Sequence, residues 1–199
     1  MKLSLTQMPE LKEAILSLPE KEKDKLLIRL INKDQMLIKQ LHYKLLENED
    51  DLIARTNEVK HHITESFTVL QKQVSRSSSV KKHDLVNVHI RQLSGVINEH
   101  AAITKDKVSE FELRLLVLDL CFTKFPDLYD LSYPNKSADK HFEYVANRIQ
   151  AILTIYDKLH PDLQYDYKNQ LLQVLEFVTS TCLEQFAKTK NSNLTSYFD

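Results

Sequence analysis

A single glycine, Gly95, is present among the 199 residues, and this scarcity limits the folds open to the chain. Tight β-hairpins usually place glycine where the backbone needs a positive φ, so sheets built from hairpins are disfavoured. Phosphate-binding loops, the dinucleotide-binding fingerprint and the nucleophile elbow need several glycines and are excluded. Only five prolines accompany this glycine, so few residues interrupt helices, and long helices are predicted.

The stretch from Leu113 to Phe125 is the most apolar part of the chain. Between Leu115 and Phe122 only Asp119 is polar, so a helix here is apolar on nearly every side and must be buried. The stretch is too short to span a bilayer, which takes roughly 20 apolar residues. It is therefore predicted to be the central helix of a helical domain.

Amphipathic stretches on both sides of this run predict further helices. Three short helices are expected at about 9–17, 20–31 and 33–46, and their succession resembles the start of a HEAT-like solenoid. Longer helices are expected at about 49–74, 80–103, 104–125, 137–156 and 161–188. The predicted fold class is therefore all-α, a bundle of about five longer helices preceded by three short helices. The predicted organisation is a single helical domain over 1–188, with a short-helix part at 1–46, a bundle at 49–188 and a loose C-terminal tail at 189–199.

Charge and cysteine content restrict the environment and the partners. The net charge of −1 creates no overall field that would attract nucleic acid or an acidic membrane, and neither partner is expected. Cys121 and Cys182 lie on apolar stretches and are predicted to be buried free thiols in a reducing compartment. The first residues lack the continuous apolar core of a signal peptide, so a cytoplasmic location is expected. A protein partner is compatible with these features, and so is a homodimer.

Five residues are candidates for a metal site: His61, His62, His83, Asp84 and Asp119. Their order resembles the H…HD…D pattern of all-helical metal phosphohydrolases, a resemblance that implies a divalent metal ion and activated water. Glu58 and His61 also have the E-x-x-H spacing that di-iron bundles use, although those proteins need the motif on two helices. The competing interpretation of the histidines is a solvated polar face.

Asp119 has a structural interpretation of its own. A carboxylate buried without a partner would have a raised pKa, so Asp119 is expected to pair with a basic group, with Arg91, Arg114 and Arg148 as candidates. A second metal hypothesis rests on Glu10-x-x-Glu13 and Glu47-x-x-Asp50, which resemble the acidic motifs of all-helical nucleotide pyrophosphatases that hold magnesium.

Two regions are candidate interaction sites. Basic residues with serines between them could bind phosphate or an acidic partner; they are Lys72, Arg76, Lys81, Lys82 and Arg91. The irregular segment from Phe125 to Ser137 adds Tyr129 and Tyr133, whose rings alternatively pin that segment to the bundle. Because no convergent catalytic set is evident, the predicted function is a non-enzymatic helical interaction or scaffold protein, with no cofactor. The alternative is a metal-dependent phosphohydrolase or pyrophosphatase.

Overall fold

The computed structural model describes residues 4–130, 136–190 and 194–198. Within these ranges the chain forms nine α-helices and three short 3₁₀ helices, and no strand is present. The all-α prediction is confirmed. No helix in these ranges is long and apolar enough to cross a membrane. The chain divides into two compact units, Met1–Glu47 and Asn48–Asp199.

The first unit consists of short helices whose ends follow from local sequence signals. It contains η1 (Leu5–Gln7), α1 (Pro9–Leu16), α2 (Glu20–Ile31) and α3 (Gln35–Leu46). Pro9 occupies the first turn of α1, where its missing N–H costs nothing. Asp34 caps α3 by accepting hydrogen bonds from the backbone N–H groups of Met36 and Leu37, at 2.9 and 3.1 Å.

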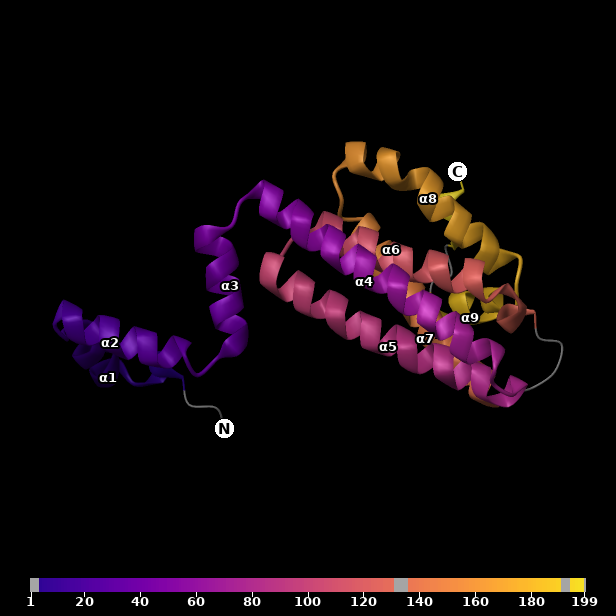
Figure 1. The fold of residues 1–199 in the computed structure, drawn as a ribbon. Helices are drawn as coiled ribbons and strands as arrows, with labels where there is room; N and C mark the ends of the chain where they lie inside the picture. The colour runs from indigo at the N-terminus through magenta and orange to yellow at the C-terminus, as the bar shows by residue number, and fades with distance from the viewer. Residues whose placement is uncertain (1–3, 131–135, 191–193, 199) are drawn as a thin grey trace. The chain divides into compact units, whose positions relative to one another are not determined.

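The second unit is a helical bundle (Figure 1). Its elements are α4 (Glu49–Ser75), α5 (Ser79–Thr104), α6 (Lys107–Lys124), η2 (Pro126–Tyr129), α7 (Lys136–Tyr156), α8 (Pro161–Thr179), α9 (Leu183–Lys190) and η3 (Leu194–Tyr197). A capping box starts α4. The Asn48 side chain accepts from the backbone N–H groups of Asp50 and Asp51, and the Asp51 carboxylate accepts from the Asn48 N–H at 2.9 Å.

The predicted central helix is α6. It packs against α4, α5, α7 and α8, as Figure 1 shows for the bundle. Its buried apolar side chains are Phe111, Leu113, Leu115, Val117, Leu118, Cys121 and Phe122. Leu116, Asp119 and Leu120 are only partly buried. One face of α6 is therefore less enclosed than the sequence predicts, and Asp119 lies on that face.

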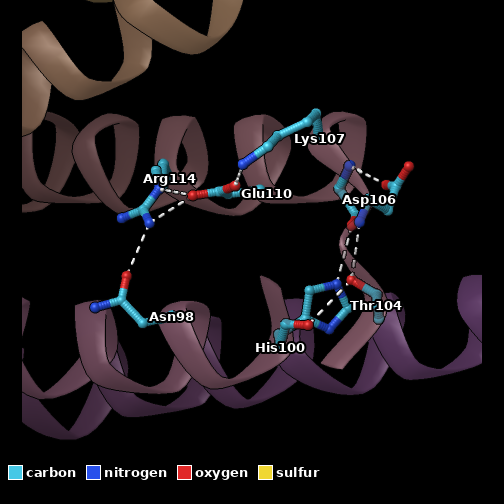
Figure 2. Close-up of polar contacts among 8 residues, drawn as sticks. Asn98, His100, Thr104, Asp106, Lys107, Glu110 and Arg114 are labelled. Carbon is cyan, nitrogen blue, oxygen red and sulfur yellow. Dashed lines mark hydrogen bonds and ion pairs between the residues drawn. The ribbon is translucent and has the colours of Figure 1, made fainter. Parts of the chain in front are cut away.

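Polar side chains fix the corner between α5 and α6 (Figure 2). Asp106 caps α6 by accepting from the Ser109 N–H at 2.6 Å. The Glu110 carboxylate, which is buried, accepts hydrogen bonds from Lys107 at 2.8 Å and from the Arg114 guanidinium at 2.7 Å. Burial by itself raises the pKa of Glu110, but these two cationic donors outweigh it and leave the pKa below its ordinary value. Both basic groups are thus used to stabilise a buried carboxylate.

The predicted last helix is interrupted, which corrects the sequence prediction of one helix from 161 to 188. α8 ends at Thr179 and α9 begins at Leu183. The Cys182 N–H and thiol both bond to the Tyr129 carbonyl oxygen, at 3.3 and 2.7 Å. The hydroxyls of Ser180 and Thr181 bond back to carbonyls three residues earlier, a local pattern that competes with helix continuation. The Tyr129 carbonyl, which is remote in sequence, therefore stabilises the break between α8 and α9.

The C-terminal segment, for which the sequence predicts a loose tail over 189–199, is described at residues 189–190 and 194–198. α9 continues to Lys190, and Leu194–Tyr197 forms η3. Leu194 is buried, and the Tyr197 hydroxyl donates to the Asp157 carboxylate at 3.0 Å. These contacts attach residues 194–197 to the bundle.

Gly95 lies on the exposed side of α5, and a Cβ placed there meets no atom within 4 Å. Alanine is favoured over glycine in a helix interior by about 1 kcal/mol. We therefore expect Gly95→Ala to raise the free energy of unfolding by about 0.5–1 kcal/mol, measured by urea denaturation. An unchanged or lower value would show that the position is constrained in a way that the fold does not explain.

Candidate functional site

The short helices of the first unit carry an unusual density of exposed apolar side chains. No residue of α1, α2 or α3 is buried. Of the fourteen large apolar side chains that are exposed among the described residues, nine precede Glu47: Leu5, Met8, Leu11, Leu16, Leu27, Ile28, Leu30, Leu45 and Leu46. Such a concentration of exposed apolar side chains in one short segment is a feature of interaction surfaces. The sequence shows these residues as amphipathic stripes, but it predicts that the stripes face inward.

The predicted metal ligands are dispersed. His61 is exposed on α4 and pairs with Glu65 at 3.1 Å, and His62 on the same helix is also exposed. Asp84 is exposed at the start of α5 and accepts a hydrogen bond from the Ser137 hydroxyl at 2.6 Å. Within residues 4–130, 136–190 and 194–198, no three His, Cys, Asp or Glu side chains are grouped so that they could hold a metal ion. The structure therefore does not bring the H…HD…D residues together.

The third candidate histidine, His83, belongs to a buried polar cluster. Its Nε2 lies 3.0 Å from the Leu128 carbonyl oxygen, and its ring lies edge-on to that of His141. His141 Nε2 is 2.9 Å from the Tyr129 hydroxyl, which is in turn 2.9 Å from the Cys121 thiol. This cluster joins η2 to α5, α6 and α7. Both histidines are buried and each bonds to a protein group of η2 through its Nε2 atom.

Burial shifts two pKa values in this cluster away from neutral pH. It raises the pKa of Cys121 to about 12, so the nucleophilic thiolate does not form near neutral pH. Burial lowers the pKa of His141 to about 3, and the nearby His83 contributes to the same shift. The prediction of two buried free thiols holds for Cys121, whereas Cys182 is half-buried.

The Tyr129 side chain is fully buried, which corrects its assignment as an interaction residue. Its ring lies edge-on to Phe122 and Phe177, with centroids 5.1 and 5.6 Å away. The alternative interpretation, that the aromatic side chain pins the segment after α6, agrees with these contacts. The second tyrosine of that segment, Tyr133, lies outside the described residues.

The predicted basic region surrounds the turn between α4 and α5. Lys72, Arg76 and Lys81 are exposed and Lys82 is half-exposed, and no ion pair involves these four side chains in the part of the chain that the structure describes. Arg91 is different, because its guanidinium lies over the Tyr144 ring at 4.9 Å. The four unpaired side chains stay a predicted interaction site.

Asp119 lines a groove in the bundle, which we call the Asp119 groove. It has a volume of about 310 Å³ and lies between α4, α6 and α8, with Lys60, Glu112, Leu115, Leu116, Asp119, Tyr167, Gln170 and Gln173 along its walls. Asp119 does not pair with any of the three arginines that the sequence offered. Arg114 bonds to Glu110 and Asn98, whereas Arg91 and Arg148 lie over the Tyr144 ring.

Only one wall of the groove is predictable from the sequence. The α6 wall has a recognisable signal, since Glu112, Leu115, Leu116 and Asp119 follow the i, i+3, i+4, i+7 spacing of one helix face. The contributions of Lys60 and Tyr167 come from other helices, and no local pattern shows that they meet this face.

No protein-family model, no curated protein and no solved structure matches the chain.

Proposed function

We propose that this protein is a non-enzymatic helical scaffold that self-associates through α1, α2 and α3, with a second copy of the chain as the occupant of their exposed apolar faces. The observation that carries the proposal is that these three amphipathic helices bury no residue. Isolated helices shorter than about 12–15 residues are marginal in water. Their stability therefore has to come from an apolar surface that packs against them.

The size of the first unit supports the need for such a surface. A domain of about 60 residues is already marginal, and chains below about 40 residues usually rely on oligomerisation, metals or disulfides. The 47 residues of Met1–Glu47 contain no cysteine. Covering one exposed leucine or isoleucine side chain contributes about 1.5–3 kcal/mol. Association of two copies would therefore stabilise both.

Charge favours a second copy over an oppositely charged partner. Residues 1–47 carry nine Lys and Arg and seven Asp and Glu, so two copies of this unit do not repel strongly. In α2 the acidic Glu20, Glu22 and Asp24 alternate with lysines. Such an alternating helix can pair with itself about a twofold axis, because each sign finds the opposite one on its neighbour.

The test measures mass in solution. Light scattering coupled to size exclusion is expected to give about twice the 23.3 kDa of one chain. We expect Leu27→Gln combined with Leu30→Gln to return the protein to one chain mass, because glutamine keeps the helix but removes the apolar contact. The matched control is Val88→Gln on α5, which is exposed to a similar extent, 54% against 52% for Leu30, and which should leave the mass doubled.

Two results would overturn the proposal. One is a wild-type protein of single-chain mass across micromolar to hundred-micromolar concentrations. The other is an unchanged mass for the double variant accompanied by a lower melting temperature, because the face would then be covered within one chain.

A further inference from the structure

The Asp119 groove has the composition of a binding site for a small cation, and this is independent of self-association through α1–α3. Its α6 wall presents Glu112 and Asp119, seven residues apart, with Leu115 and Leu116 between them. Seven residues of α-helix span about 10.5 Å. The groove thus offers two carboxylates separated by an apolar floor, and its α8 wall adds Gln170 and Gln173.

One of the two carboxylates is already satisfied. The Lys60 ammonium lies 2.6 Å from Glu112 Oε2, and the Tyr167 hydroxyl donates to Glu112 Oε1. Burial raises the pKa of Tyr167 and the Glu112 carboxylate raises it further, so the hydroxyl stays protonated and keeps donating. Lys60, the one cationic side chain among the described residues that line the groove, is therefore already paired at one end.

Asp119 provides the unsatisfied charge at the other end. Its carboxylate has no hydrogen bond or ion pair with any residue that the structure describes. Partial burial raises the pKa of Asp119 above its ordinary value, since the carboxylate is less well hydrated than in open water. A cationic hydrogen-bond donor is the chemical group that would restore the lost stabilisation.

We propose that the Asp119 groove binds a small aliphatic primary amine, with the ammonium on Asp119 and the hydrocarbon chain over Leu115 and Leu116. The side-chain amides of Gln170 and Gln173 supply acceptor oxygens beside the ammonium. A groove of about 310 Å³ is at the small end of ligand sites, which run from about 300 to 1,000 Å³. An anion is disfavoured, because two carboxylates and one ammonium line the walls.

The experiment is a calorimetric titration with three probes of similar size and different charge: hexylamine, hexanol and hexanoate. Saturable one-to-one binding of hexylamine is expected, with hexanol and hexanoate weaker by about tenfold or more, because only the amine pairs with Asp119. Asp119→Asn should weaken hexylamine binding by about tenfold. The matched control, Asp127→Asn, changes an exposed aspartate of η2 and should leave binding unchanged.

A gain-of-affinity variant protects the test against a folding defect in Asp119→Asn. Gln173 is exposed on α8, so Gln173→Glu adds a carboxylate to the groove with little change in shape and is expected to tighten hexylamine binding about threefold or more. The proposal is overturned if hexylamine does not saturate the protein at millimolar concentrations. It is equally overturned if hexanoate binds as well as hexylamine, or if neither Asp119→Asn nor Gln173→Glu changes the affinity.

Discussion

Replacing Tyr129 with alanine is expected to lower the free energy of unfolding of the bundle by about 3–5 kcal/mol, the usual cost of removing a large buried aromatic side chain. The Tyr129 side chain has no exposed surface and contacts the rings of Phe122, Phe142 and Phe177. Alanine would leave a cavity in this aromatic cluster and would also remove the hydrogen bonds of the hydroxyl to Cys121 and His141.

A second substitution separates the ring from the hydroxyl. Tyr129→Phe keeps the aromatic contacts and loses only the hydrogen bonds, so it should cost about 1–2 kcal/mol. Urea denaturation followed by circular dichroism measures both values. Tyr165→Ala is the matched control, because Tyr165 on α8 is 82% exposed, and its effect should stay within about 0.5 kcal/mol. An effect of Tyr129→Ala as small as that of the control would contradict a core role and restore Tyr129 as a surface residue.

The starts of the helices were predictable where a local sequence signal marks them. Pro9 and Pro161 mark helix starts, and Asn48 with Asp51 forms the capping box that begins α4. The break between α8 and α9 was not predictable in this way, because it depends on bonds from Cys182 to the Tyr129 carbonyl, 53 residues away. Apolar periodicity continues across the break, so the sequence reads as one helix.

The groove shows a second limit of sequence reasoning. Asp119 stands out as the polar position in an apolar run, and the structure does place it in a groove. Asp119 was nevertheless expected to pair with an arginine, because a helix that is apolar on nearly every side is predicted to be fully enclosed. Which face of α6 stays open depends on how α8 lies along it, and α8 presents Tyr167, Gln170 and Gln173 there rather than apolar side chains.

In the first unit, the sequence also does not show which apolar faces are covered. Leu27 and Leu30 lie three residues apart on α2, and such a helical spacing predicts only that an apolar face exists. It does not state whether the covering surface belongs to the same chain. These side chains are exposed in the structure. The surface that covers them is therefore expected to belong to another molecule rather than to the same chain.

Acid is expected to destabilise the bundle through His141. Burial lowers the pKa of this histidine from 6.5 to about 3, with His83 nearby as the second cause. Between these two pH values the unfolded chain binds a proton that the folded chain does not, so stability is lost as the pH falls below 6.5. One pKa unit corresponds to about 1.4 kcal/mol. His141 alone should therefore lower the free energy of unfolding by about 2 kcal/mol between pH 7 and pH 5.

The measurement compares urea denaturation of the wild type and of His141→Gln at pH 7, 6 and 5. His89 and His100 also have lowered pKa values because of burial, so the variant retains part of the acid sensitivity and the decisive quantity is the difference between the two profiles. That difference should shrink by about 2 kcal/mol as the pH falls from 7 to 5, because the variant has no imidazole to protonate on unfolding. His61→Gln is the control for the loss of a surface histidine: His61 is exposed on α4, and its substitution should change the free energy of unfolding at pH 7 by no more than about 0.5 kcal/mol. If the profile of His141→Gln ran parallel to that of the wild type, His141 would be protonated equally in the folded and unfolded chains, and the buried neutral imidazole beside Tyr129 would be ruled out.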